Sequence, residues 1–366
     1  MFSAQDHGHM AQALRLAARG LYTTRPNPRV GCVIVNDGCV VGEGFHAQAG
    51  GPHAEIVALS RAGEAAQGAT VYVTLEPCCH FGRTAPCVDA LIAARVAHVI
   101  YAIEDPNPRV AGGGAARLNA AGITFERGLM GDAARELNRG FFTRHTHGRP
   151  WVCVKIALSL DGKTALANGR SQWITGVPAR ADVQRLRAEA GAIVTGSGTV
   201  LADDPQLTVR DPTYDVAGRP PGRIVIDTNL RTPPSARLFD AAGEVTIFTA
   251  STHAASHAAL KARRASIEVI RSTATGIDLA AVFARLGALE INDVLVEAGA
   301  TLVGSLLQHG LVDELVLYYA PLILGAGARS AFTWPVLETL DAAPRFQVIE
   351  SRSIGADHRV ILRASA

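Results

Sequence analysis

The 366-residue sequence lacks an apolar run of membrane-spanning length, and residues 1–7 include no basic stretch that leads into an apolar one. We therefore expect neither a transmembrane helix nor a secretory signal. Charged residues are few, at 19% of the chain, and the formal net charge is only +2. This balance argues against a nucleic-acid or membrane partner and favours small-molecule ligands.

Cysteine is also scarce, and three of the six cysteines crowd one short segment: Cys78, Cys79 and Cys87. In a long chain without an export signal, this grouping favours reduced thiols over disulfides, and hence a cytoplasmic protein. The other three lie in apolar, strand-like stretches, where we expect them to be buried: Cys32, Cys39 and Cys153.

The chain is too long for one typical hydrophobic core, so its length predicts two domains. Strand patterns alternate with helix patterns in both halves, which predicts layered α/β sheets. A polar segment, 142–150, ends in Gly148-Arg149-Pro150 and marks the expected boundary between domains 1–147 and 148–366. The expected helices include 9–20, 54–62, 88–94 and 178–190, and the expected strands include 31–35, 39–44, 70–75, 96–103, 151–157, 192–195, 223–227, 245–248, 293–297, 314–319 and 359–362.

The most informative motif is His53-Ala54-Glu55, followed by Pro77-Cys78 and then Cys87. In zinc deaminases a His and two Cys hold the metal, the fourth position is left to water, and a Glu two residues after the His moves protons. His53, Cys78 and Cys87 are therefore the expected zinc ligands, and Glu55 is the expected proton shuttle. The spacing is unusual, because eight residues separate the two cysteines where the deaminase signature has two.

Two other interpretations of this motif stay open. Cys79 or His80 could supply a fourth ligand, which would make a closed, structural zinc site in a binding protein. Neighbouring residues seldom both reach one metal ion, so we expect Cys79 and His80 to pack or to line the pocket instead. A chance grouping is disfavoured because Pro77-Cys78 follows a clear strand, as the signature requires.

Three loops are candidate ligand contacts. The Asn27 carboxamide offers one donor and one acceptor, as the edge of a pyrimidine requires, although Asn27 could simply form a turn before Pro28. In the second half, the glycine loops 196–199 and 299–305 each follow a strand and could present backbone N–H groups to phosphate. Neither loop matches G-x-G-x-x-G, and either could be a tight structural turn.

Taken together, these motifs resemble the bifunctional deaminase/reductase family of riboflavin biosynthesis over nearly the whole chain. The long loop between the cysteines is typical of that family. The resemblance implies an α/β fold: a cytidine-deaminase-like α/β/α layered domain followed by a dihydrofolate-reductase-like α/β domain. It rests on residues 26–31, 53–55, 77–87, 155–163, 171–174, 202–210 and 296–299.

The resemblance also implies two reactions. A zinc-dependent hydrolytic deamination of 2,5-diamino-6-(5-phosphoribosylamino)pyrimidin-4-one would precede an NADPH-dependent reduction to 5-amino-6-(5-phosphoribitylamino)uracil. The cofactors would be Zn²⁺ and NADPH, the partner would be a phosphorylated pyrimidine, and we expect a homo-oligomer. Deamination of another nucleoside or of a tRNA base is the alternative that the zinc motif alone leaves open.

Site residues follow from the resemblance by position. The NADPH site would be lined by Ala157, Trp173, Thr199, Asp203, Thr228, Gly299, Ala300, Thr301, Leu302, Val303, Gly304 and Ser305. The substrate would be faced by Ser171, Arg187, Leu207, Arg210 and Glu297, in addition to Asn27. Arg187 and Arg210 suit a clamp on a ribose 5-phosphate, because a guanidinium group pairs bidentately with phosphate.

Overall fold

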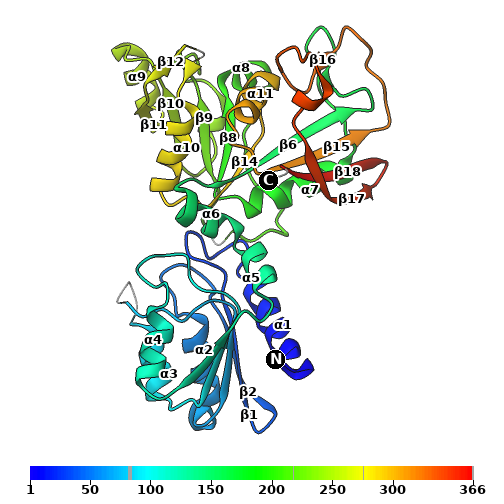
Figure 1. Ribbon diagram of the computed structural model, residues 1–366. Helices are drawn as coiled ribbons and strands as arrows, with labels where there is room; N and C mark the ends of the chain where they lie inside the picture. The colour runs from blue at the N-terminus through cyan, green and yellow to red at the C-terminus, as the bar shows by residue number, and fades with distance from the viewer. Residues whose placement is uncertain (81–84, 217, 275, 365–366) are drawn as a thin grey trace. The chain divides into compact units, whose positions relative to one another are not determined.

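The computed structural model describes residues 1–80, 85–216, 218–274 and 276–364, so the part of the cysteine loop from Phe81 to Thr84 lies outside the described residues. The chain divides into two compact units, Met1–Gly148 and Arg149–Ala366 (Figure 1). None of the described helices combines the length and the apolar character that crossing a bilayer requires.

The first unit is built on a five-stranded sheet with the strand order β2-β1-β3-β4-β5. Strand β1 is antiparallel to both neighbours, whereas β3, β4 and β5 run parallel to one another. The turn at Asp37 and Gly38, both with positive φ, closes the β1–β2 hairpin. The strands are β1 (Gly31–Asn36), β2 (Cys39–Phe45), β3 (Thr70–Val73), β4 (His98–Tyr101) and β5 (Thr124–Arg127).

Alternate strand residues of this sheet face two different layers of helices. Ile34 and Val99 pack with residues of α2, α3 and α4, whereas Val33 and Ile100 pack with residues of α1 and α5. The period of two in a strand therefore produces an α/β/α layering (Figure 1). The helices are α1 (Ala4–Ala18), α2 (Ala54–Ala62), η1 (Gly63–Ala66), α3 (Cys87–Ala93), α4 (Gly113–Ala120), α5 (Gly131–Leu137) and α6 (Arg139–His147).

The second unit contains a nine-stranded sheet with the order β11-β10-β9-β8-β14-β6-β15-β18-β17. The strands from β11 to β15 in this order are parallel, and β18 and β17 continue the sheet antiparallel. Its strands are β6 (Trp151–Ser159), β8 (Ala192–Gly196), β9 (Gly222–Ile226), β10 (Val245–Thr249), β11 (Ser266–Val269), β14 (Asp293–Val296), β15 (Glu314–Ala320), β17 (Phe346–Ile354) and β18 (Asp357–Ala364). Two short ribbons pair β7 (Lys163–Ala165) with β16 (Arg329–Ser330), and β12 (Ser272–Thr273) with β13 (Gly276–Ile277).

Helices cover both faces of this sheet as well. Val152 and Val154 of β6 pack with residues of α10 and α11, whereas Cys153 packs with residues of α7. In a parallel sheet of this kind, ligands bind beyond the carboxyl ends of the strands, so those ends are the place to seek a site. The helices are α7 (Val177–Glu189), α8 (Ser197–Asp203), η2 (Arg237–Phe239), α9 (Ala254–Lys261), α10 (Leu279–Ala288), α11 (Ala300–Gln308) and η3 (Leu340–Ala342).

Most of the segment 142–150 is helical, since α6 runs to His147 and ends at Gly148, which has φ 67°. Two local expectations were wrong. The first helix begins at Ala4, not residue 9, because Ser3 and Asp6 form a capping box that starts it earlier. Cys39 is exposed, because it is the first residue of β2, at the edge of the sheet next to the hairpin turn.

Candidate functional site

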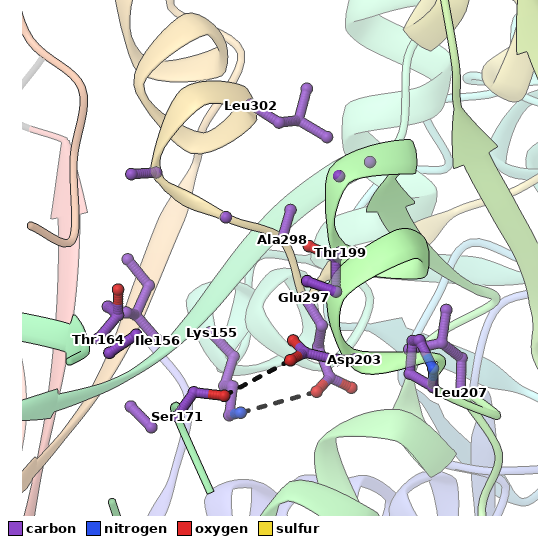
Figure 2. Close-up of a pocket in the computed structure, with 18 of the residues that line it drawn as sticks. Lys155, Ile156, Thr164, Ser171, Thr199, Asp203, Leu207, Glu297, Ala298 and Leu302 are labelled. Carbon is purple, nitrogen blue, oxygen red and sulfur yellow. Dashed lines mark hydrogen bonds and ion pairs between the residues drawn. The ribbon is translucent and has the colours of Figure 1, made fainter. Parts of the chain in front are cut away.

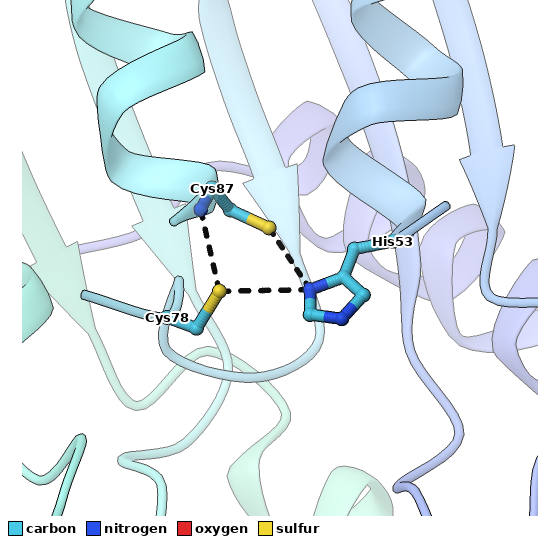
Figure 3. Close-up of side chains that lie close together, drawn as sticks. All are labelled: His53, Cys78 and Cys87. Carbon is cyan, nitrogen blue, oxygen red and sulfur yellow. Dashed lines mark hydrogen bonds between the residues drawn. The ribbon is translucent and has the colours of Figure 1, made fainter. Parts of the chain in front are cut away.

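Three potential metal ligands from separate parts of the first unit lie together (Figure 3). His53 precedes α2, Cys78 follows β3, and Cys87 is the first residue of α3. Their ligand atoms lie within 4.8 Å of one another. His53 Nδ1 is 3.1 Å from Cys87 Sγ and 3.5 Å from Cys78 Sγ. One nitrogen and two sulfurs at this spacing fit a tetrahedral Zn²⁺ ion with one position left open.

The hydrogen bonds of this cluster favour a thiolate at Cys78. Cys87 and His53 both hydrogen-bond to the Cys78 sulfur and lower the pKa of Cys78 to about 4. The backbone N–H of Cys87 donates to the same sulfur, with an N···S distance of 3.2 Å. The contact with Cys78 raises the pKa of Cys87 and also that of His53. Since the thiolate is the form of cysteine that binds a metal, Cys78 is prepared for zinc by its own surroundings.

Glu55 lies in the first turn of α2 and is buried, with 4% of its surface exposed. Burial, together with the negative charge of Cys78, raises the pKa of the Glu55 carboxyl group. A carboxyl group whose pKa moves toward neutrality can both accept a proton and return it. The structure thus places Glu55 beside the metal cluster in an environment that suits the proton shuttle expected from the sequence.

Asn27 is connected to this region through His46. The Asn27 Nδ2 atom is 3.0 Å from His46 Nε2, and His46 Nδ1 is 3.0 Å from the carbonyl oxygen of Pro52. A carbonyl group can only accept, so Nδ1 carries the ring proton and Nε2 accepts from the Asn27 amide. Burial lowers the pKa of His46, which favours this neutral ring. The ring centroids of His46 and His53 are 5.3 Å apart, so Asn27 is held close to the metal cluster.

Cys79 packs outside the ligand cluster. Its sulfur lies 3.7 Å from the carbonyl oxygen of Arg109 and 3.8 Å from that of Val110. The loop that contains these residues is held by Glu76, which accepts from the backbone N–H groups of Gly112 and Gly114 at 3.0 Å each. Sequence reasoning missed Glu76, because its partners lie in a different loop. His80 is likewise outside the group of three ligands that the described residues form.

The second unit contains a cavity of about 1190 Å³ along β6 and beyond the ends of β8, β9 and β14 (Figure 2). Ligand sites for one small molecule usually have about 300 to 1000 Å³, so this cavity is larger than a typical single-ligand site. Most residues expected from the sequence at the cofactor and substrate sites line it: Ala157, Ser171, Trp173, Arg187, Thr199, Asp203, Leu207, Arg210, Thr228, Glu297, Gly299, Ala300, Thr301, Leu302 and Ser305.

Val303 and Gly304 do not line this cavity. Val303 is part of the hydrophobic core, and a Cβ atom at Gly304 would lie 2.0 Å from the carbonyl oxygen of Thr333. Helix α11 has 3.6 residues per turn, so it presents Thr301, Leu302 and Ser305 to the cavity and turns its other side toward the protein interior. The cavity lining therefore includes five of the seven residues of segment 299–305, and the role expected of Val303 and Gly304 stays a prediction.

Glu297 lies between two cations in the cavity. Arg187 Nε is 2.5 Å from Glu297 Oε1, and Arg187 Nη2 is 3.0 Å from Oε2. Lys155 Nζ lies 3.6 Å from the same Oε2 atom (Figure 2). Burial alone would raise the pKa of Glu297, but the charges of Arg187 and Lys155 lower it to about 2. Glu297 is therefore a carboxylate at any pH at which the protein works.

The two arginines that the sequence suggests as a phosphate clamp differ in their surroundings. Arg187 is engaged by Glu297 and also donates to the carbonyl oxygen of Thr208 at 3.0 Å. Arg210 makes no ion pair within the described part of the chain and is held through its backbone N–H, which donates to Gln184 Oε1 at 2.7 Å. Arg210 is consequently the one of the two whose guanidinium group remains available to an anion.

Lys155 is the main cavity residue to which sequence reasoning gave no role. It is the single charged residue in the otherwise uncharged strand β6. A charge in a strand that is covered on both faces requires a partner or a ligand, and this was the signal that could have identified it. Other cavity residues that carry a charge and were missed are Arg180, Asp204, Arg231, Arg237 and Arg329.

The glycine loops of the cavity fit a dinucleotide such as NADPH. A Cβ atom at Gly198 would have no neighbour within 4 Å, and at Gly299 the nearest atom would be Thr199 Oγ1 at 3.9 Å. The backbone at both loops is therefore open on the side away from the protein, where a phosphate can approach it.

Comparisons with known proteins agree with this division. The cytidine and deoxycytidylate deaminase zinc-binding region matches residues 3–103, and the RibD C-terminal domain matches residues 150–360. The chain is 51% identical to the riboflavin biosynthesis protein RibD of Escherichia coli (strain K12), over 96% of this chain and 98% of that protein. It is 46% identical to the RibD protein of Haemophilus influenzae, over 97% of this chain and 96% of that one.

Solved structures give the same result. The RibD structure of Acinetobacter baumannii matches with a TM-score of 0.92 and 44% identity, over 99% of both chains. A diaminohydroxyphosphoribosylaminopyrimidine deaminase/5-amino-6-(5-phosphoribosylamino)uracil reductase from Thermotoga maritima matches with a TM-score of 0.86 and 32% identity, also over 99% of both chains. These matches confirm the expected fold, a cytidine-deaminase-like domain followed by an α/β reductase domain. The chain therefore belongs to the RibD family of bifunctional deaminase/reductases of riboflavin biosynthesis, which use zinc and NADPH.

Proposed function

We propose that each unit of this chain carries one of the two reactions of the family, with domains 1–147 and 148–366 as the deaminase and the reductase. The observation that carries the proposal is the convergence of His53, Cys78 and Cys87 beside the buried Glu55. The substrate is 2,5-diamino-6-(5-phosphoribosylamino)pyrimidin-4-one, and the product of both steps is 5-amino-6-(5-phosphoribitylamino)uracil.

In the deaminase unit, His53, Cys78 and Cys87 would hold Zn²⁺, which would supply Lewis-acid activation of a water molecule. Glu55 takes one proton from the attacking water and delivers it to the adjacent ring nitrogen, then takes the remaining hydroxyl proton and delivers it to the amine, which leaves as ammonia. Asn27, oriented by its hydrogen bond to His46, binds the edge of the pyrimidine. The two protons pass in turn through one carboxyl group, and the raised pKa of Glu55 suits that task.

In the reductase unit, NADPH supplies the hydride, and the protein binds and orients both ligands. Lys155 and Glu297 lie against the ribosyl group, because they form the charged centre of the cavity. Arg210 binds the 5-phosphate of the substrate, and Ser171 and Leu207 complete the substrate side. The residues that would hold the cofactor are Ala157, Trp173, Thr199, Asp203, Thr228 and the exposed side of 299–305.

We also propose that the protein is a cytoplasmic homo-oligomer that binds no nucleic acid. None of the six cysteines, all of which lie in the described part of the chain, forms a disulfide, as a reducing compartment favours. Strand β17 is an edge strand of the large sheet and exposes Val348 and Ile349, which supports burial of this edge against a second copy. The low net charge, +2, supports a small-molecule substrate over a nucleic acid.

The test is to incubate the purified protein with the diaminopyrimidinone substrate, with and without NADPH, and to follow ammonia and NADPH together. We expect one ammonia per substrate molecule in both incubations, with and without NADPH. Where NADPH is present, one NADPH should be consumed per substrate molecule, and only after deamination. The variant Glu55→Gln should release no ammonia but should still oxidise NADPH with the deaminated substrate. Ammonia release that is unchanged in this variant would overturn the deaminase mechanism, and failure to consume NADPH with deaminated substrate would overturn the reductase assignment.

A further inference from the structure

One arginine at the end of β9 lines the cavity and has no assigned role. The Arg231 Nη2 atom donates to Ser197 Oγ, with a distance of 3.3 Å. Within the described residues, Arg231 makes no ion pair with an acidic side chain, although it contributes to the cavity lining. A cation that faces a cavity without an acidic partner is a candidate for binding an anionic ligand group.

The turn that carries Arg231 is fixed at both ends. Asp227 Oδ2 accepts from the backbone N–H of Thr232 at 2.6 Å and from its hydroxyl group at 2.7 Å. At the other end, the carbonyl oxygen of Thr228 accepts from the backbone N–H of Ala250, which follows β10, at 3.1 Å. The fold therefore determines where the Arg231 backbone lies, and only the side chain is free to adjust to a ligand.

The strand order places this turn at one end of the cavity. Four neighbouring strands, in the order β6-β14-β8-β9, carry or precede residues of the cavity. These residues are, in the same order, Lys155, Gly299, Gly198 and Arg231. Adjacent strands are separated by about 4.8 Å, so the end of β9 lies roughly 10 Å from that of β14 and about 14 Å from β6. Arg231 is thus at the opposite side of the cavity from Lys155.

A dinucleotide can be placed along this line. The reacting nicotinamide must lie near Lys155 and Glu297, where the charged centre of the cavity is. The open backbone at Gly299, which precedes α11, comes next and suits the pyrophosphate. The adenosine half then extends to β9, where Thr228 and Arg231 line the cavity.

We propose that Arg231, together with the hydroxyl groups of Ser197 and Thr228, binds the 2′-phosphate of NADPH and so determines the preference for NADPH over NADH. This inference rests on the proposed reductase function of the second unit. The 2′-phosphate is the only group by which the two cofactors differ, and it is a phosphomonoester, which a guanidinium group can bind with two parallel hydrogen bonds. Ser197, already in contact with Arg231, supplies a further donor to the same anion.

The proposal is tested by calorimetric binding of 2′,5′-ADP, 5′-AMP, NADPH and NADH to the full-length protein and to Arg231→Ala and Arg231→Lys. We expect Arg231→Ala to weaken the binding of 2′,5′-ADP and NADPH by roughly 10- to 100-fold, because the phosphate loses a charged hydrogen-bonding partner. Binding of 5′-AMP and NADH should change less than about twofold, because they lack the group that Arg231 contacts. The affinity of Arg231→Lys for NADPH should lie between those of the unaltered protein and Arg231→Ala, because lysine keeps the charge without the bidentate geometry.

Arg345→Ala is the matched control, since it removes the same charge from an exposed position outside the cavity. It should leave all four affinities unchanged. Equal weakening of NADPH and NADH in Arg231→Ala, or no weakening of either, overturns the proposal. If Arg231→Ala fails to fold, Ser197→Ala and Arg231→Lys give the same comparison. If the unaltered protein binds neither NADPH nor 2′,5′-ADP, the proposed reductase function itself fails, and this result is distinct from a change in selectivity.

Discussion

Arg187 and Glu297 form an ion pair with two hydrogen bonds inside the cavity of the second unit, at 2.5 Å and 3.0 Å. Lys155 lies 3.6 Å from the same carboxylate, so two positive charges face one negative charge and the group carries a net charge of +1. We predict that Arg187→Ala lowers kcat/KM for NADPH oxidation by roughly 10- to 100-fold, because Glu297 then loses its main partner. Ammonia release from the unreduced substrate should not change, since the metal ligands belong to the other unit.

Arg185 provides the control for this prediction. It lies on the same helix, α7, and pairs with Asp182 at 2.8 Å and with Glu189 at 2.6 Å, but it does not line the cavity. Arg185→Ala should therefore affect stability more than NADPH oxidation. If both variants reduce NADPH oxidation to the same extent, Arg187 acts by supporting α7 and not through Glu297.

The pKa of Glu297 predicts how acid affects the second unit. Its ordinary value is 4.5, and in the folded protein it is about 2. Because folding lowers the pKa of this carboxyl group, its ionisation stabilises the folded state at any pH above the ordinary pKa. This contribution is lost as the pH falls from about 4.5 to 2. The side chain is largely buried, with 12% exposed, and the full contribution is at most about 3 kcal/mol.

Urea unfolding of the unaltered protein and of Glu297→Gln at pH 6, 4 and 3 measures this contribution. The variant should be less stable at pH 6, and the difference between the two proteins should become smaller as the pH falls below about 4.5. A difference that stays constant over this range would show that the ionised carboxylate does not contribute to stability in the way proposed.

Removal of zinc should leave Cys78 as a reactive thiolate. Hydrogen bonds from Cys87 and His53 hold the pKa of Cys78 at about 4, so it remains deprotonated at pH 6. We predict that iodoacetamide modifies Cys78 at pH 6 after chelation of the metal, and that reloading zinc protects it. Peptide mapping by mass spectrometry identifies the modified residue. Protection that does not depend on zinc would mean that the metal is not bound at Cys78.

The zinc content of cysteine variants distinguishes an open zinc site from a closed one. Cys79→Ser should retain one zinc per chain, because the Cys79 sulfur packs against the carbonyl oxygens of Arg109 and Val110. Cys78→Ser should lose the metal. Loss of zinc from Cys79→Ser would indicate a fourth protein ligand, and with it a structural site in place of the proposed catalytic one.

The sequence predicted those parts of the molecule that depend on local patterns. Alternating apolar residues predicted most strands of both sheets, and the His-x-Glu and cysteine motif predicted the group of three ligands that the structure brings together. It could not predict pairings between distant segments, such as Lys155 with Glu297, Asn27 with His46, or Glu76 with the loop before α4. Each of these depends on which strands become neighbours, and that order is a property of the whole sheet.

A different limit appears in α11. A run of consecutive residues, 299–305, was expected to line the cofactor site, but a helix shows only part of its circumference to one cavity. The burial of Val303 and the close approach of Gly304 to Thr333 follow from packing on the opposite side. Sequence similarity locates the segment, whereas only the structure separates the side that faces the ligand from the side that faces the core.

Gly304 gives a direct test of this separation. Alanine is normally preferred over glycine inside a helix by about 0.5 to 1 kcal/mol. At Gly304, however, the new Cβ atom would lie 2.0 Å from the carbonyl oxygen of Thr333 and 3.0 Å from its carbonyl carbon, both of which are backbone atoms that cannot turn aside. We therefore predict that Gly304→Ala lowers the free energy of unfolding of the second unit by about 1 to 3 kcal/mol, the usual cost of overpacking.

Gly198→Ala is the matched substitution, because it also lies in a helix but its Cβ atom would have no neighbour within 4 Å. It should leave stability unchanged or raise it by up to about 1 kcal/mol, and any effect on NADPH binding should be direct, since Gly198 lines the cavity. Gly304→Ala should show the reverse pattern: a lower melting temperature, but nearly normal NADPH affinity at temperatures where the variant is folded. Normal stability together with weakened NADPH binding in Gly304→Ala would place residue 304 in the cofactor site, since a side chain whose nearest neighbours are backbone atoms of Thr333 should act on stability first.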